Sequence, residues 1–197
     1  MDSVDTIRTD LDDAMLAAAH QRGEPWAFKA LFERHQGWVF NLAYRMVRSR
    51  DEAADLTQEV FLRVHRRLPT LKSHEAFLTW LRRIAVNVCK DYLKRRRVAT
   101  TPLEQQGDDG ESETRDLPDA TADPAKGVLG RELKRRLEEA IASLSDDHRA
   151  VVVMHHLQGM EVTDIARVMK CSVGTVKSRL SRARAALREQ LRGYVEE

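Results

Sequence analysis

Residues 161–191 read EVTDIARVMKCSVGTVKSRLSRARAALREQL and predict a short helix, a tight turn at Lys170–Ser172 and a longer helix. The hydroxyl of Ser172 can accept a hydrogen bond from an unpaired N–H in the first turn of the longer helix. The apolar residues of that helix recur at the spacing of one face: Val176, Leu180, Ala183 and Leu187. Lys170 stands where glycine is often preferred, and a left-handed backbone there costs about 1 kcal/mol. The stretch therefore predicts a helix-turn-helix.

The opposite face of the longer helix combines small residues with cations. At about 100° per residue, that face carries Gly174, Ser178, Ser181, Arg182 and Ala185. Lys177, Arg179 and Arg184 flank it. Small residues let a helix enter the major groove of DNA, while the cations reach phosphates and base edges. A solvated basic face on a structural helix is the simpler alternative, but the turn and the cap favour DNA binding.

The whole composition is typical of an all-α protein, with 32% charged and 6% aromatic residues and little Gly or Pro. The longest apolar run, at 150–154, is too short to cross a membrane, and the first twenty residues do not form a secretory signal. Cys89 and Cys171 are isolated, so we expect reduced thiols in a cytoplasmic protein, with no membrane insertion and no metal site. The pair His155-His156 is expected to hold ordinary surface and core positions.

Residues 98–126 are expected to be a flexible acidic linker between two small helical domains. They carry eight acidic and two basic residues, three of the five prolines and no apolar periodicity. The flanking domains, 1–97 and 127–197, are both net basic. Helices are expected in the first domain at 12–22, 25–47, 51–67 and 74–96. In the second they are expected at 130–144 and at 146–158, the latter with Ser145 as N-cap and Gly159 as its end.

The helix expected at 74–96 places aromatic, amide and cationic groups on one strip. Its packing face is Phe77, Leu81, Ile84, Val88 and Tyr92, and the neighbouring strip is Trp80, Arg83, Asn87, Lys90 and Lys94. Such a strip can stack on bases, pair with an unstacked base edge and hold the nucleic-acid backbone. Taken alone, Trp80 is more simply explained as a core residue.

The helix expected at 51–67 has a different outer face. Its inward positions are Ala53, Thr57, Val60, Phe61 and Val64, and its outward positions are Asp55, Gln58, Glu59 and Leu62. An exposed leucine among carboxylates and an amide suits a protein partner, with the leucine as anchor and the charges setting register. A generic solvated surface is the alternative.

Together these segments closely resemble a sigma factor of bacterial RNA polymerase from the extracytoplasmic-function (ECF) group. The resemblance covers residues 27–97 and 133–192, in the family's order with a linker between them. DEAADLTQEVFLRVHRRL resembles the segment that binds core polymerase, and FLTWLRRIAVNVCKDYLKRRR resembles the −10 promoter segment. GTVKSRLSRAR, within the helix-turn-helix, resembles the −35 promoter segment.

The resemblance implies a role for each set of residues. The core-polymerase contacts would be Asp55, Gln58, Glu59 and Leu62. The −10 contacts would be Lys72, Ser73, His74, Trp80, Arg83, Asn87, Lys90 and Lys94. The −35 contacts would be Thr175, Lys177, Ser178, Arg179, Ser181, Arg182 and Arg184. The linker would thread the channel used by nascent RNA, and an anti-sigma factor would be a further partner.

The predicted function is a promoter-specificity subunit, a binding module and not an enzyme. It would dock on core RNA polymerase, bind the −35 and −10 elements of promoter DNA and start transcription of a specific gene set. No P-loop or catalytic constellation stands out, and we expect no cofactor. The main alternative is a dimeric helix-turn-helix regulator that binds DNA alone, which leaves the outer faces at 55–62 and 80–94 without a role. A sigma-like decoy that only sequesters an anti-sigma factor is a third possibility.

Overall fold

The computed structural model of the protein describes residues 11–99 and 124–192, and all regular secondary structure in these two ranges is helical. The N-terminal half holds α2 (Asp13–Gln21), α3 (Pro25–Val47), α4 (Arg50–Arg67), η1 (Leu68–Thr70) and α5 (Phe77–Ala99). The C-terminal half holds α6 (Pro124–Ser143), α7 (Asp146–Val152), η2 (Val153–Leu157), α8 (Val162–Met169) and α9 (Val173–Gln190). The prediction of an all-α fold is confirmed.

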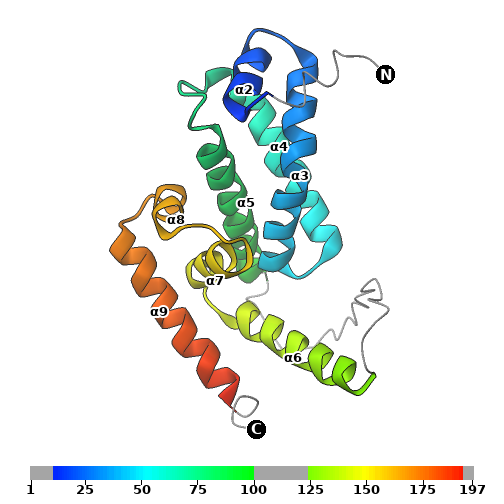
Figure 1. Cartoon of the computed structure of the whole chain (residues 1–197), viewed down its shortest axis with the longest axis vertical. Coiled ribbons are helices and arrows are strands. Elements are labelled where there is room, and N and C mark those ends of the chain that lie inside the picture. Colours follow the sequence, from blue (N-terminus) through cyan, green and yellow to red (C-terminus); the bar gives the residue numbers. More distant parts are fainter. Residues whose placement is uncertain (1–10, 100–123, 193–197) are drawn as a thin grey trace.

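The long helix α3 organises the N-terminal half, because α2, α4 and α5 all pack against it (Figure 1). Pro25 opens α3 at a position where its missing N–H costs nothing. The helix ends at Arg48, whose left-handed backbone (φ 63°) lets its N–H bond to the carbonyl of Tyr44 at 2.8 Å. Between these ends, the fully buried residues form the face toward the other helices: Ala27, Leu31, Val39, Leu42, Ala43 and Met46.

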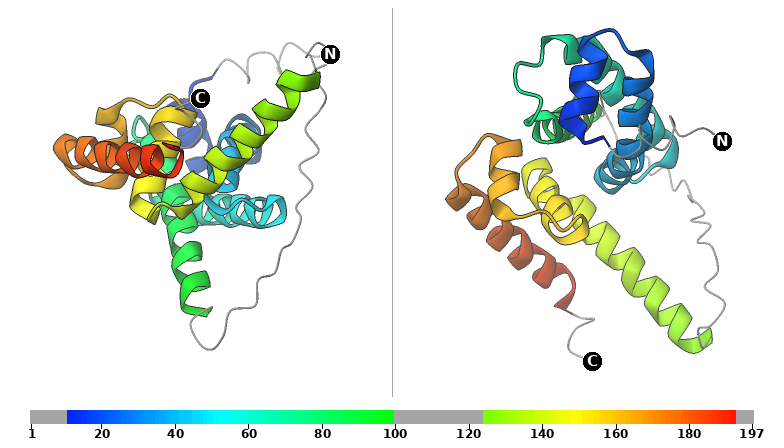
Figure 2. Two further views of the ribbon diagram at one scale, coloured as in Figure 1. Left: turned by 90° about the horizontal axis from the view of Figure 1, so that it is seen from below. Right: turned by 45° about the horizontal axis from the view of Figure 1, so that its top comes forward.

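In the C-terminal half, α7 packs against α9, and α8 packs against both α9 and α5. The N-terminal part of α6 projects away from the other helices in both views of Figure 2. The turn between α8 and α9 has the expected geometry: Lys170 is left-handed at φ 52°, and Ser172 Oγ accepts a hydrogen bond from Thr175 N at 3.0 Å. The predicted helix-turn-helix is therefore present.

Several predicted helix boundaries and one predicted cap differ from the structure. The helix expected from residue 74 begins at Phe77, because two successive turns at 73–77 precede it. The helix expected from residue 130 begins at Pro124, where proline is compatible with a first helical turn. Ser145 precedes α7 but makes no capping bond, so it is not the side-chain cap that we expected. The helix expected over 146–158 widens into the π-turn η2, in which Gln158 N bonds Val153 O, before Gly159 ends it at φ 65°.

The two halves are in direct contact. The side chain of Arg149, on α7, is 9% exposed and donates to the carbonyl of Met46 near the end of α3 at 2.6 Å. The same guanidinium donates to the carbonyls of Ala142 and Leu144 at the end of α6. In Figure 1, α7 and α8 lie against α5, so the C-terminal half covers part of that helix. The predicted linker is represented only by its ends, at 98–99 and 124–126; its residues 100–123 lie outside the described residues.

The left-handed Lys170 gives a test of the turn. Glycine adopts this backbone conformation without the steric cost that a Cβ imposes, so Lys170→Gly should raise the free energy of unfolding by about 0.5–1 kcal/mol. The same replacement within α9, Lys177→Gly, should lower it by a similar amount, about 0.5–1 kcal/mol, because glycine is a poor helix residue. Urea denaturation of the two variants measures both changes. A loss of stability for Lys170→Gly would contradict the assigned turn.

Candidate functional site

The outer face of α4, here called the α4 surface, consists of Asp55, Gln58, Glu59 and Leu62. Leu62 is 52% exposed, and Asp55 and Gln58 are also exposed. Glu59 is half-buried and pairs with Arg63 one turn away at 2.7 Å. The inward positions predicted for this helix are all buried: Ala53, Thr57, Val60, Phe61 and Val64. The helix therefore exposes a leucine among polar neighbours, an arrangement that suits a protein partner.

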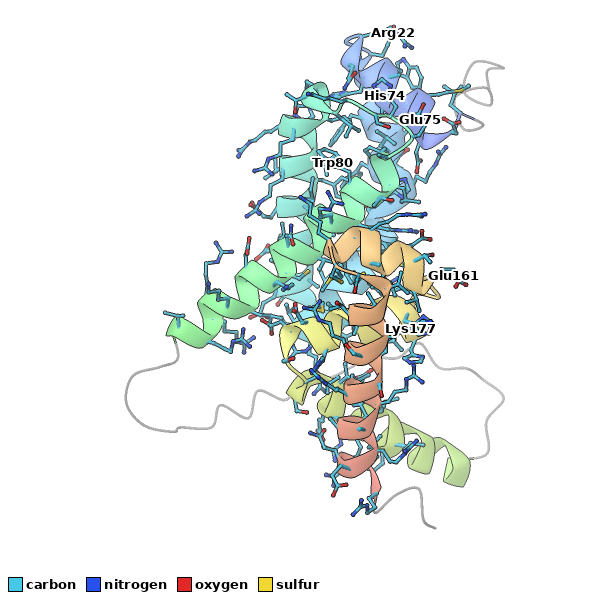
Figure 3. The ribbon with its side chains drawn as sticks, turned by 90° about the vertical axis from the view of Figure 1, so that its left-hand side faces the viewer. Arg22, His74, Glu75, Trp80, Glu161 and Lys177 are labelled. Carbon is cyan, nitrogen blue, oxygen red and sulfur yellow. The ribbon has the colours of Figure 1, made fainter. Side chains whose placement is uncertain are left out.

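The outer face of α9, the α9 surface, is exposed as its periodicity predicted. Val176, Leu180 and Ala183 are buried and Leu187 is half-buried. The exposed positions are Gly174, Lys177, Ser178, Ser181, Arg182, Arg184 and Ala185. Thr175 is half-buried beside the cap, its hydroxyl 2.9 Å from Ser172 Oγ. Lys177 points outward from the upper part of α9 in Figure 3.

Arg179 differs from its neighbours on α9. Its side chain is only 24% exposed and forms an ion pair with Asp147 of α7 at 2.5 Å. Sequence periodicity placed Arg179 on a flank of the outer face, and the structure turns this flank toward α7. A contact from Arg179 to DNA therefore requires this ion pair to open.

The strip on α5, called the α5 strip, consists of Trp80, Arg83, Asn87, Lys90 and Lys94, and it is only partly accessible. Asn87 and Lys94 are exposed, whereas Trp80 is half-buried with its ring 6.1 Å from that of Phe77. Arg83 donates to the carbonyl of Arg167 at 2.8 Å, at the end of α8. Lys90 forms an ion pair with Asp147. Two of the three cations in the strip are thus engaged by the C-terminal half.

The segment at 71–76, called the α5 loop, precedes the strip. Lys72 and Ser73 are exposed, and the Ser73 hydroxyl donates to Glu75 Oε2 at 2.9 Å. The backbone N–H of Glu75, the Ser73 hydroxyl and the His74 ring hold the pKa of the Glu75 carboxyl below its usual range. In Figure 3, His74 and Glu75 lie at one end of the molecule, with Trp80 below them on α5. The loop thus leads directly into the first turn of α5, where the strip begins at Trp80.

Two carboxylates at the start of α7, those of Asp146 and Asp147, pair with cations from both halves of the chain. Asp147 binds Lys90 of α5 through one oxygen and Arg179 of α9 through the other, and Asp146 binds Arg97 at 2.5 Å. Partial burial acts to raise the pKa of Asp147, but the hydrogen bond and charge of Lys90, with the charges of Arg179 and His148, outweigh it. The pKa of Asp147 therefore lies below its ordinary value.

The sequence alone does not predict this ionic interface, because two carboxylates after a serine are also typical of an ordinary helix start. Their partners on α5 lie 49 and 57 residues away in sequence. No local pattern connects residues at such separations.

The remaining titratable groups offer no metal site among the residues that the structure describes. Burial raises the pKa of the Cys89 thiol to about 12, so this cysteine is an inert core residue. His155 bonds to the carbonyl of Met160 through Nδ1 at 2.9 Å, and the ring of His156 lies 4.7 Å away. In the described ranges, no helix is both long enough and apolar enough to span a membrane.

Two family models match the parts of the chain that carry these surfaces. Residues 31–98 match the model of sigma-70 region 2. This range includes the α4 surface, the α5 loop and the α5 strip. Residues 134–187 match the model of sigma-70 region 4, which includes the α9 surface. The chain is 34% identical over 191 residues to the RNA polymerase sigma-H factor of Pseudomonas aeruginosa, covering 96% of this chain and 98% of that protein. It is 36% identical over 180 residues to the ECF RNA polymerase sigma-E factor of Escherichia coli, covering 90% and 93%.

Two solved structures share the fold. CnrH, solved in complex with the cytosolic domain of CnrY, aligns over 92% of this chain and 98% of its own, with a TM-score of 0.66 and 26% identity. The sigma factor RpoE of Bartonella quintana, solved with the anti-sigma factor NepR, aligns over 84% and 96%, with a TM-score of 0.60 and 21% identity. At 21% identity the second likeness supports the fold alone.

The two serines that precede α7 and α9 provide a matched pair for testing the helix-turn-helix. Ser172 caps α9 with its side chain and Ser145 makes no such bond to α7. Ser172→Ala should lower the free energy of unfolding by about 1 kcal/mol, whereas Ser145→Ala should change it by less than about 0.5 kcal/mol. Thermal or urea unfolding measures both values. Equal losses from the two variants would contradict the assigned cap.

Proposed function

The chain belongs to the ECF group of sigma-70 RNA polymerase sigma factors, and on this premise we propose that three of its surfaces divide the work of promoter-specific initiation. The N-terminal half binds core polymerase and the −10 element, and the C-terminal half binds the −35 element. The observation that carries this proposal is the exposure of the small residues and cations along α9, opposite a buried apolar stripe.

The α4 surface is the proposed site for core polymerase. Leu62 offers an exposed apolar anchor, and Asp55 and Gln58 stand beside it without burial. An apolar anchor within a polar rim is the arrangement in which a few residues supply most of the binding energy. The charge of Asp55 and Glu59 would favour a partner surface of positive potential and fix its register.

The α9 surface is the proposed site for the −35 duplex. Gly174, Ser178 and Ser181 leave room for close approach to the groove floor, and Arg182 has the planar guanidinium that binds guanine through two hydrogen bonds. Lys177 and Arg184 lie beside this face and are exposed, so they can reach phosphates on either side. Thr175 and Arg179 complete the proposed set, Arg179 after release from Asp147.

The α5 loop and the α5 strip are the proposed site for the unpaired −10 strand. Lys72, Ser73 and His74 would hold a base that has left the stack, and Trp80 and Asn87 would meet the bases beside it. Lys94 is exposed and can hold a phosphate. Because the C-terminal half engages Arg83 and Lys90, full use of the strip requires the halves to move apart.

The proposal extends to the setting and partners of the protein. It would act in the cytoplasm, where the polymerase is, as a binding subunit without catalytic activity of its own. An anti-sigma factor is a proposed partner, and CnrH was solved with a bound protein, the cytosolic domain of CnrY. The proposed path of the acidic linker through the polymerase concerns segment 100–123, which lies outside the described residues.

Run-off transcription tests the proposal directly. Purified core polymerase would be assayed with and without the protein on DNA fragments from upstream of its own coding region. Defined transcripts that depend on the protein are expected, and their start sites locate both promoter elements. A DNA complex formed by the protein alone, without such transcripts, would instead favour the dimeric helix-turn-helix regulator.

Arg182 tests the −35 assignment. If Arg182 makes a two-bond contact with a base, Arg182→Ala should cost about 1–3 kcal/mol of discrimination, or about 5- to 150-fold, between the natural −35 element and one altered at that base. Arg188→Ala is the control, since Arg188 is an exposed arginine in the last turn of α9. The readout is transcription from both promoters by the reconstituted holoenzyme. Unchanged discrimination by the Arg182 variant would contradict the assignment.

Leu62 tests the polymerase assignment. Leu62→Ala should weaken binding to core polymerase about tenfold or more, through loss of a central apolar anchor, with little change in stability. Met15→Ala is the control, because Met15 is 56% exposed on α2, outside the α4 surface. Binding is measured by fluorescence anisotropy with labelled protein and titrated core enzyme. Equal affinities for the two variants would remove Leu62 from the interface.

A further inference from the structure

Gln21, the last residue of α2, binds three points of the segment that leads into α5. Its Nε2 donates to the carbonyl of Leu68 at 2.8 Å and to the carbonyl of Leu71 at 2.9 Å. Its Oε1 lies 2.8 Å from Nε2 of His74. The two N–H donors and the carbonyl of one side-chain amide are thus all directed at a single stretch of chain.

These bonds attach the α5 loop to the core of the N-terminal half. The other bonds of the loop are local turns, such as Leu71 N to Leu68 O at 3.1 Å and Phe77 N to His74 O at 3.0 Å. Local turns shape a loop without fixing its position. Helix α2 is packed into the core through its buried residues Leu16, Ala17 and Ala19. Because Gln21 belongs to this helix, its bonds fix the loop relative to the core. Figure 3 shows His74 and Glu75 beside Arg22, the residue that follows Gln21.

The amide also selects the tautomer of the His74 ring. Because its NH₂ group faces two carbonyls, its Oε1 must accept the bond from the imidazole, so Nε2 of His74 carries a proton. In the neutral ring, Nδ1 is then a hydrogen-bond acceptor. A loop held in this way presents an acceptor that suits an N–H group on a base edge.

We propose that Gln21 is a positioning residue for −10 recognition, which fixes the α5 loop and the tautomer of His74. This inference rests on the proposed function, which assigns an unpaired −10 base to Lys72, Ser73 and His74. Gln21 itself acts through the loop and contacts no base. Its loss changes which −10 sequences are accepted and leaves −35 recognition and polymerase binding intact.

The test uses full-length protein reconstituted with core polymerase on the promoter found by run-off transcription. Gln21→Leu keeps the volume and removes all three bonds, and Gln21→Glu keeps an acceptor for His74 but cannot donate to the two carbonyls. Arg22→Ala is the control next to it in sequence. Transcription is measured from promoters altered at each −10 position or at −35. Discrimination at one or more −10 positions should fall at least fivefold for both Gln21 variants, with −35 discrimination and core affinity within twofold of the unmodified protein.

Each other outcome overturns the inference. Unchanged −10 discrimination in the Gln21 variants would show that the loop is positioned without the amide. Equal losses at −10 and −35 would show general weakening of the fold. His74→Ala and Lys72→Ala separate this inference from its premise: if they alter −10 preference while the Gln21 variants do not, only the inference fails. If none of the four variants alters it, the −10 assignment of the loop fails as well.

A second, independent observation concerns Asp147. One carboxylate binds Lys90 of the α5 strip and Arg179 of α9, and the neighbouring Asp146 binds Arg97. Arg83 donates to the carbonyls of Arg167 and Val168 at the end of α8, where a helix concentrates negative partial charge. Groups of negative charge therefore occupy cations from both proposed DNA-binding surfaces.

We infer that this closed arrangement is an autoinhibited state of the free protein, in which Asp146 and Asp147 occupy cations that DNA phosphates would otherwise contact. Opening separates Lys90 of α5 from Asp147, whereas Arg179 lies in the same half as Asp147 and stays paired with it. The C-terminal half thereby limits DNA binding by the protein before it joins the polymerase. This inference also rests on the proposed DNA-binding surfaces, but its structural part, the ionic closure, does not.

The test compares two double variants with the same change in charge. Asp146→Asn with Asp147→Asn removes the ionic closure, and Glu132→Gln with Glu139→Gln removes two carboxylates that pair within α6. Small-angle scattering measures the radius of gyration, and anisotropy measures binding of a labelled 20-nucleotide single strand carrying the −10 element. The aspartate variant should be larger and bind at least fivefold more tightly than the unmodified protein, and the glutamate variant should stay within twofold.

Three results would each overturn this second inference in whole or in part. Equal gains in DNA binding by both double variants would attribute the effect to net charge alone. An unchanged radius of gyration in the aspartate variant would show that these carboxylates do not close the molecule. If the aspartate variant is larger but does not bind DNA more tightly, the ionic closure is supported and its inhibitory role is overturned. The structural part of the inference is thus tested apart from the proposed DNA-binding surfaces.

Discussion

One buried guanidinium, that of Arg149, joins the two halves of the chain. It donates to the carbonyl of Met46 near the end of α3 and to those of Ala142 and Leu144 at the end of α6. The C-terminal ends of helices carry negative partial charge and unpaired carbonyls, so a buried cation is stabilised there. Burial lowers the pKa of Arg149, but a guanidinium retains its proton at neutral pH. Without it, carbonyls from both halves would lose a donor, and Asp146 and Asp147, on the same helix, would lose their fixed position relative to α5.

Sequence periodicity predicted which faces of the helices are buried, because a 3.6-residue repeat is a local property that packing preserves. Thr57 and Leu62 on α4, and Leu180 and Ser181 on α9, lie on the expected sides. The engagement of Arg83 and Lys90 was not predictable in this way, since it depends on partners more than 50 residues away in the sequence. The same limit hid Gln21, whose bonds to the α5 loop cross 47 to 53 residues. A polar residue at a helix end carries no local sign of such a role.

The proposed binding surfaces differ in accessibility, and this difference sets the order in which partners can bind. The α4 surface is accessible while the two halves are in contact, with Asp55, Gln58 and Leu62 exposed. The α5 strip is partly covered, and Arg179 is paired with Asp147. On the proposed assignments, binding of a large partner to α4 therefore needs no prior opening, whereas complete binding of DNA does. A partner that holds the halves apart also removes the free-energy cost of opening from the DNA-binding step, which is positive coupling between the two events.

The separation in sequence between Lys90 and Asp147 also has a consequence during synthesis on the ribosome. The N-terminal half brings together helices that are neighbours in the chain, so it can fold as soon as α5 has emerged. Asp147 follows Lys90 by 57 residues, which takes on the order of 3–11 s to translate at about 5–20 residues per second. Throughout this interval the nascent chain carries Lys90 without Asp147, its carboxylate partner. Docking of the halves is therefore the last step of folding, and each new molecule passes through an open form before it first closes.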